Sequence, residues 1–287
     1  MDELYARVNS TTKQALYQFM KDQDISLLKY HFDHYFKFCV QENNIQVLPH
    51  HFSSHKIEGL TVVDEFGTSF SYERDNPKVK QNFTLCHELG HFILKHDGNY
   101  FAESIDNQEN LLEREANVFS AVVLMPDIVL LSKIYYSCET FHQVQNSLAV
   151  SKQALFFRLL DFLRKYYSGK DSEIKQAVET YIEGKNASIF RLFHDIREQI
   201  IEEFHQFQPS LINQVKQRVR KVGFVTSLEY PELSNQDNWQ AIKASSINLK
   251  TWLLIYNKGK SIAYVWDKEK FSDKEARKKA ELQLLLM

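Results

Sequence analysis

Apolar residues recur three and four positions apart over much of the chain, the spacing that places them on one face of an α-helix. Residues 1–44 follow this pattern and predict a helical N-terminal segment. Two further helices are expected at about 172–183 and 187–206, with Gly184 as the break between them. The pattern therefore predicts a chain rich in helix.

A few short stretches have the composition of strands instead. Residues 56–73 predict a hairpin around a turn that contains Gly67, because glycine accepts the positive φ that such turns require. A second hairpin is expected at 251–266 and a short strand at 222–225. A capping box at 272–275 begins a terminal helix. Together, these elements predict an α+β protein.

The order of elements suggests three parts. Residues 1–44 form the helical segment, residues 45–167 a second domain, and residues 168–287 a mixed α/β domain. The polar stretch 168–171 is the expected boundary, because polar and glycine-containing segments commonly link domains. The last part carries no phosphate loop, nucleophile elbow or second metal motif, and we expect it to act in sensing, substrate docking or oligomerisation.

The chemistry concentrates in His87-Glu88-Leu89-Gly90-His91. On a helix, His87 and His91 share a face, so both imidazoles can reach one Zn²⁺ at roughly 2.0–2.1 Å. Glu88 then lies beside that face, where a carboxylate can take a proton from an activated water. Apolar neighbours at helical spacing favour a metal site over an idle surface helix.

A catalytic zinc needs a third protein ligand, and the helix expected at 111–124 offers two acids. Glu115 shares its face with apolar residues, and a carboxylate there must be paired, neutral or metal-bound. Glu113 shares its face with polar residues and is most simply a solvated acid. We therefore predict Glu115 as the third ligand, with Glu113 in reserve. The alternative for Glu115 is a salt bridge to an arginine elsewhere.

The remaining histidines are not expected to be ligands. His96 lies too near His91 for the extended three-histidine motif, and it should point away from the His87/His91 face if the helix is regular. We expect it to interact with the last carbonyls of the helix. His31 and His34 lie among aromatic residues, and the histidines at 50, 51 and 55 have no acid or cysteine at a useful spacing.

Two blocks of sequence resemble the ImmA/IrrE family of metallopeptidases. Residues 82–94, Asn-Phe-Thr-Leu-Cys-His-Glu-Leu-Gly-His-Phe-Ile-Leu, are similar to the family's zinc-binding block. Residues 113–126 resemble its second block, Glu-x-Glu-Ala-Asn-x-Phe-Ala-Ala, which ends in Leu-Met-Pro. A weaker similarity continues at 148–159. The resemblance covers about residues 45–163, and Cys86 stands where the family usually has a small alanine.

The resemblance implies a zincin-like, gluzincin-like metallopeptidase domain over residues 45–167, with helix-turn-helix-like helices at its end. It also implies a cytoplasmic zinc endopeptidase that regulates transcription by cleaving a helix-turn-helix repressor, in a phage, an integrative element or a stress response. Glu88 would be the catalytic base, and His87, His91 and Glu115 the metal ligands. The alternative is a catalytically silent scaffold that binds a repressor or DNA without proteolysis.

Composition agrees with a soluble protein of the reducing cytoplasm. No run approaches the roughly 18 apolar residues of a membrane span, and the N-terminus lacks a signal-peptide pattern. Three widely spaced cysteines suggest no disulfide framework. Residues 210–287 carry a net charge of +6 and the rest −8, which is compatible with solvated surfaces, domain attraction, an acidic partner or weak nucleic-acid contact. The sequence does not indicate an oligomeric state.

Two elements have candidate roles in recognition. Residues 68–72 are proposed as a strand whose edge receives the substrate backbone, with an ordinary sheet strand as the alternative. Tyr72 is a weak candidate for stabilising the oxyanion. Residues 152–163, capped by Ser151, carry cations that a DNA-reading helix would use, but their apolar residues favour packing against the catalytic domain.

Overall fold

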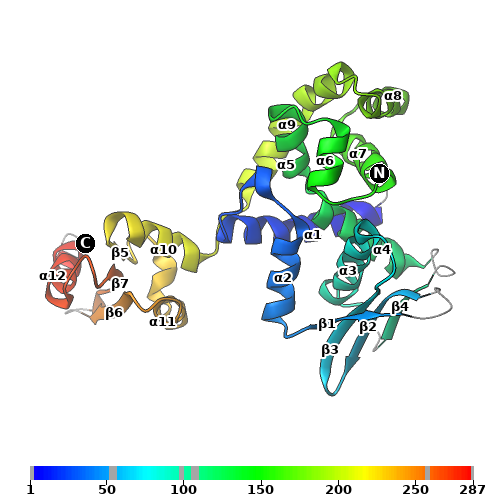
Figure 1. Ribbon diagram of the computed structural model, residues 1–287. Coiled ribbons are helices and arrows are strands. Elements are labelled where there is room, and N and C mark those ends of the chain that lie inside the picture. Colours follow the sequence, from blue (N-terminus) through cyan, green and yellow to red (C-terminus); the bar gives the residue numbers. More distant parts are fainter. Residues whose placement is uncertain (1–2, 52–56, 97–99, 105–109, 256–258, 286–287) are drawn as a thin grey trace. The chain divides into compact units, whose positions relative to one another are not determined.

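The computed structural model describes residues 3–51, 57–96, 100–104, 110–255 and 259–285 (Figure 1). Its contacts divide the chain into two compact units, Met1–Gln208 and Pro209–Met287. We call them the N-terminal and C-terminal units and describe each by itself. The division follows Gln208 and not the polar stretch 168–171, because the helices after that stretch pack against those before it.

The N-terminal unit begins with α1 (Glu3–Asp22), a short 3-10 turn η1 (Leu27–Lys29) and α2 (Phe32–Glu42). The helical character predicted for this region is confirmed. α1 packs against α4 (Leu111–Leu124) and buries one face, whose side chains include Val8, Leu16, Phe19 and Met20. Arg7, an exposed residue of α1, also reaches Glu115 of α4.

A four-stranded sheet follows, in the order β1-β3-β2-β4. Its strands are β1 (Gln46–His50), β2 (Ile57–Asp64), β3 (Gly67–Glu73) and β4 (Tyr100–Ser104). The predicted hairpin is β2 and β3, which pair antiparallel, whereas β1 runs parallel to β3. Because β3 is hydrogen-bonded on both sides, residues 68–72 cannot take an added substrate strand, and that expectation is wrong. Among the described strands, β1 and β4 form the edges.

α3 (Lys78–Ile93) lies across this sheet and contacts β2, β3 and, most extensively, α4 (Figure 1). Gly90 permits the close approach of the two helices. A Cβ at Gly90 would lie 3.1 Å from a ring carbon of Phe119 and 3.2 Å from the Cα of Ala116. α3 begins at Lys78, directly after its N-cap residue Pro77.

The chain continues through α5 (Asp127–Leu130), a π-helical turn η2 (Leu131–Tyr136), α6 (Phe141–Ser147), α7 (Lys152–Tyr166), α8 (Asp171–Ile182) and α9 (Ala187–Gln206). The predicted cap Ser151 is confirmed, since its hydroxyl accepts the N–H of Ala154. The stretch Leu111–Tyr136 is long and apolar enough to cross a membrane, but 78% of its most apolar window is buried inside the unit. It is therefore a core segment of this unit.

A buried ionic cluster joins four of these helices. It consists of Lys13, Asp127, Arg158, Tyr166 and Glu203, from α1, α5, α7 and α9. The Asp127 carboxylate forms ion pairs with Lys13 and Arg158, and all three side chains are at most 1% exposed. Arg158 also donates to the carbonyl of Met125 at 3.1 Å. Arg158 is therefore part of the core, which agrees with the packing role expected for residues 152–163.

The C-terminal unit contains α10 (Leu211–Val222), β5 (Phe224–Thr226), a 3-10 turn η3 (Pro231–Ser234), α11 (Gln236–Ala244), β6 (Leu249–Ile255), β7 (Ser261–Asp267) and α12 (Asp273–Leu285). The predicted second hairpin is β6 and β7, and β5 completes a sheet in the order β5-β7-β6. The capping box is also confirmed, because Ser272 and Glu275 bond each other's backbone N–H. Neither α10 nor α11 was predicted.

Candidate metal centre

His87 and His91 lie one turn apart on α3 and their side chains converge. Both residues are 1% exposed, and their Nε2 atoms are 3.0 Å apart. A cation bound by both Nε2 atoms would stabilise this close approach. The predicted pair is therefore brought together on one face of the helix.

The carboxylate that joins them belongs to Glu113 on α4. One Glu113 oxygen lies 2.9 Å from His87 Nε2, and the other lies 3.7 Å from His91 Nε2. These three residues offer ligand atoms within 4.8 Å of one another. Ligands around a tetrahedral Zn²⁺ at roughly 2.0–2.1 Å are about 3.3 Å apart, so the observed separations fit such an ion.

Glu115, the predicted third ligand, is not in this group. Its carboxylate accepts from His96 Nε2 at 2.9 Å and forms an ion pair with Arg7 of α1. The argument that a carboxylate in an apolar stripe needs a partner was sound, but the partners are an arginine and a histidine. Glu113, the reserve, lies on the side of α4 that meets α3, where it contacts His87.

Glu88 lies against the central strand β2. It is fully buried, and one carboxylate oxygen accepts from the hydroxyl of Thr61 at 2.5 Å. Gly59 lies over the other oxygen, where an added Cβ would be only 2.3 Å away. Strand β2 thus holds the carboxylate of Glu88, the residue directly after His87. Only glycine at position 59 leaves room for this carboxylate.

The outer nitrogens of the two histidines also have partners. His87 Nδ1 lies 3.0 Å from the side-chain oxygen of Asn117, and His91 Nδ1 lies 2.8 Å from His96 Nδ1. Such contacts orient metal-binding imidazoles and select the tautomer whose Nε2 is free to ligate. Asn117 was not identified from the sequence, although it lies four residues after Glu113 on the same helical face.

The expectation for His96 is wrong, because α3 does not continue regularly past Ile93. Lys95 adopts the left-handed conformation, with φ of 55°. The N–H of His96 then bonds the carbonyl of His91, and the N–H of Lys95 bonds that of Phe92. This is a Schellman motif, which turns the chain back and places the imidazole of His96 beside His91.

The electrostatics of the site favour a charged carboxylate. Burial raises the pKa of Glu113, but its hydrogen bonds to His87 and His91 and their charges outweigh this effect and lower the pKa to about 2. Burial lowers the pKa of His91, although its hydrogen bond to Glu113 opposes the change. An ionised carboxylate beside two imidazoles is a donor set that Zn²⁺ accepts.

A groove of about 850 Å³ lies alongside these ligands. His87, Glu113 and Asn117 line one part of it. The rest is formed by α3, α4 and the start of α7, with apolar side chains that include Val79, Phe83, Leu124, Val150, Ala154 and Phe157.

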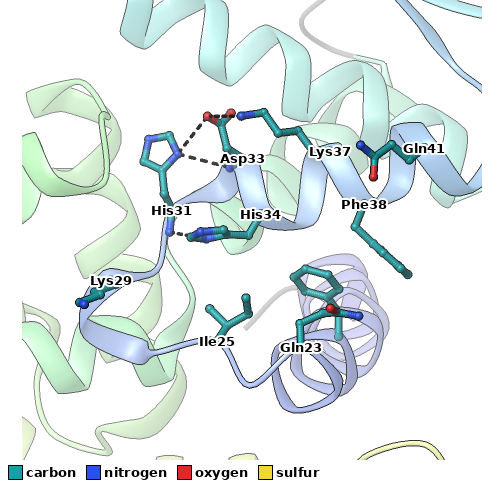
Figure 2. A pocket seen from close by; sticks show the side chains of 10 residues that line it. Gln23, Ile25, Lys29, His31, Asp33, His34, Lys37, Phe38 and Gln41 are labelled. Atoms are coloured by element: carbon teal, nitrogen blue, oxygen red, sulfur yellow. Dashed lines mark hydrogen bonds and ion pairs between the residues drawn. The ribbon is translucent and has the colours of Figure 1, made fainter. Parts of the chain in front are cut away.

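The other predicted non-ligand histidines have local partners. Figure 2 shows a pocket of about 700 Å³ near α2, lined in part by His31 and His34. The backbone N–H of Asp33 donates to His31 Nδ1 at 3.4 Å, and that of His31 donates to His34 Nδ1 at 3.3 Å. These contacts cap α2.

His51 does have acidic neighbours, contrary to the spacing argument, because β1 pairs with β3. Glu73 and Asp75 each place an oxygen 3.1 Å from His51 Nδ1. The same Glu73 oxygen accepts the N–H of Asp75, so it also closes the turn after β3. His50 contacts Ser71 and the carbonyl of Ile57. Residue 55 lies outside the described residues.

Comparison with known families gives one match. Residues 40–160 match the Peptidase_M78 model, described as the IrrE N-terminal-like domain. The matched segment runs from α2 into α7 and contains His87, Glu88, His91 and Glu113. No curated protein and no solved structure matched the chain. The predicted resemblance to the ImmA/IrrE family is confirmed, and such a metallopeptidase domain implies a bound metal.

Proposed function

Because residues 40–160 form an IrrE N-terminal-like domain of the ImmA/IrrE family, we propose that this protein is a zinc-dependent endopeptidase with a regulatory role. Its proposed substrate is a helix-turn-helix transcriptional repressor, and its proposed location is the cytoplasm. The substrate follows from the family resemblance. The hydrolytic chemistry follows from the residues of the metal centre.

The observation that carries the proposal is the convergence of His87, His91 and Glu113, with Glu88 directly after His87 on the same helix. Two imidazoles and one carboxylate are a common protein ligand set of hydrolytic zinc enzymes, which leave a coordination position open. When bound there, a divalent ion supplies Lewis acidity to a carbonyl oxygen and makes water more acidic. The packing of α3 against the sheet, with α4 supplying the acid, suits this role.

Glu88 is the proposed general base. Its carboxylate takes a proton from the attacking water as the new C–O bond forms at the scissile carbonyl. The same proton is then delivered to the nitrogen of the leaving amine as the C–N bond breaks. Thr61 donates to one oxygen of Glu88 and Gly59 packs over the other, so β2 holds the carboxylate in one orientation.

The groove beside the metal centre is the proposed substrate site. Its apolar side, formed by residues such as Phe83 and Phe157, suits a substrate segment with a large apolar side chain near the scissile bond. The edge strand β4 is a candidate for main-chain pairing with that segment, since β3 has both edges occupied. The oxyanion-stabilising role suggested for Tyr72 stays a prediction.

A second reading is a silent scaffold that binds a repressor or DNA without cutting it. Such a protein would need neither a general base nor the close fit of Gly59 over Glu88. The burial of Arg158 in the ionic cluster also removes one of the cations that α7 would offer to DNA. We therefore favour the endopeptidase.

The test uses the zinc-loaded full chain and a candidate helix-turn-helix repressor. The wild type should produce defined fragments, a chelator should prevent them, and added Zn²⁺ should restore them. Glu88→Gln should keep its metal and lose cleavage by at least about 100-fold. Gel retardation of DNA without any fragment would favour the scaffold, and equal cleavage of casein would contradict a regulatory specificity.

A further inference from the structure

A hydrogen-bonded series runs from the metal centre to the first helix of the chain. His91 Nδ1 lies 2.8 Å from His96 Nδ1, and His96 Nε2 lies 2.9 Å from a carboxylate oxygen of Glu115. The other oxygen of Glu115 accepts from the guanidinium of Arg7 on α1. We call the three residues Arg7, Glu115 and His96 the relay.

The donors and acceptors of this series are consistent with only one arrangement when His91 binds a metal. A neutral imidazole that ligates through Nε2 carries its proton on Nδ1. His91 Nδ1 therefore donates to His96 Nδ1, and the remaining proton of His96 lies on Nε2. That N–H donates to Glu115, an acceptor in its ionised form. Each imidazole ring thus has one donor nitrogen and one acceptor nitrogen, and every N–H in the series faces an acceptor.

His96 and Glu115 of the relay are buried, and Arg7 is exposed. The side chains of His96 and Glu115 are 3% and 7% exposed, whereas that of Arg7 is 58% exposed. A buried carboxylate needs an opposite charge, and Arg7 supplies it from outside the matched segment 40–160. His91 and Glu115 engage the two ring nitrogens of His96, and His96 is not part of the group formed by His87, His91 and Glu113.

We propose that His96 is a positioning residue for the metal ligand His91, that Glu115 orients His96, and that Arg7 holds Glu115. The relay raises metal affinity by fixing the ring of His91 with Nε2 toward His87 and Glu113. It also makes α1 part of the metal centre, although α1 contributes no ligand. This proposal rests on the proposed function only in requiring that the centre binds a divalent ion.

The test measures zinc affinity of the metal-stripped full chain by competition with a chromogenic chelator. His96→Phe and Glu115→Gln should each weaken zinc binding about 10–100-fold, the range for partners of metal ligands. The double variant should lose little more zinc affinity than the more strongly affected of the two single variants, because both changes break the same hydrogen-bonded series. Arg7→Met should weaken zinc binding less, about 2–5-fold, since Arg7 is largely exposed.

Matched controls separate positioning from general loss of structure. Gln14→Met changes an exposed residue of α1, and His194→Phe removes an imidazole that bonds Tyr135 instead. Both should bind zinc like the wild type. The melting temperature of each metal-free variant is measured alongside, and Glu115→Gln serves as the conservative change if His96→Phe does not fold. The absorption spectrum of the Co²⁺ form reports on coordination.

Two results would overturn the relay. One is unchanged affinity in His96→Phe and Glu115→Gln, and the other is a Co²⁺ spectrum showing that His96→Phe has lost a ligand. A wild type that binds no zinc overturns both the relay and the proposed function. Coupled losses of affinity together with an unchanged Co²⁺ spectrum support the relay, even if no peptide bond is ever cleaved, and in that case only the peptidase proposal falls.

Discussion

Replacing Asp127 by alanine is expected to destabilise the N-terminal unit by about 3–5 kcal/mol, the cost of breaking a buried ion pair from one side. The carboxylate is fully buried and pairs with Lys13 and Arg158, which are themselves almost fully buried. Tyr166 also donates to it at 2.7 Å. Its removal leaves two cations that water cannot reach.

The remaining contacts favour the lower half of that range. Lys13 keeps Glu203 at 2.8 Å, and Arg158 keeps the carbonyl of Met125. For a unit of this size, 1 kcal/mol corresponds to about 2–4 °C, so a loss of 3–4 kcal/mol lowers the melting temperature by about 6–16 °C. The measurement is urea and thermal unfolding of wild type and Asp127→Ala, followed by circular dichroism.

The control is Glu179→Ala, which removes one partner of an exposed ion pair with Lys175. Such pairs contribute about 0–1 kcal/mol, so this variant should unfold near the wild type. The reasoning about the cluster is refuted if Asp127→Ala loses less than about 1 kcal/mol with a normal unfolding slope. That result would mean that water or other side chains replace the carboxylate.

Three further predictions concern pH, Gly59 and Lys95. Burial raises the pKa of Asp127 and Glu203, but Lys13 and the other cations outweigh burial and lower both pKa values. The two carboxylates therefore stabilise the fold fully above their ordinary pKa values of about 4, and this stabilisation is lost as the pH falls below those values. Urea unfolding between pH 6 and 3 should show the falling free energy of unfolding, and a flat wild-type profile would contradict the prediction. Gly59→Ala should lower the free energy of unfolding by about 1–3 kcal/mol, because the new Cβ displaces the Glu88 carboxylate. The variant should no longer cleave the repressor, while its zinc affinity stays near that of the wild type. Normal cleavage by this variant would rule out the close fit between Gly59 and Glu88. Lys95→Gly should raise stability by up to about 1 kcal/mol, because glycine relieves the left-handed backbone; a destabilised variant in thermal unfolding would argue against the Schellman turn.

Locally encoded features were predictable from the sequence. Helical periodicity identified α1, α8 and α9, and the glycine-containing turn at Gly67 identified the β2–β3 hairpin. The spacing of His87 and His91 identified two candidate ligands, because positions four apart share one helix face regardless of the rest of the fold.

Features that depend on packing between distant segments were not predictable in the same way. The choice between Glu113 and Glu115 depends on which face of α4 meets α3, and Arg7, which pairs with Glu115, lies on a helix far away in the sequence. His96 reaches His91 only because Lys95 takes a backbone conformation that is uncommon for lysine. β1 was missed because its partner β3 is a strand distant in the sequence.

The central claim is that His87, His91 and Glu113 hold one divalent ion. The most direct measurement is X-ray diffraction at the zinc absorption edge from crystals of the zinc-loaded protein, together with elemental analysis of Glu113→Gln and Glu115→Gln. We expect one zinc per chain, bound by His87, His91 and Glu113, and a far larger loss of zinc in Glu113→Gln than in Glu115→Gln. An anomalous peak coordinated by Glu115, or no peak after reconstitution with zinc, would contradict the account.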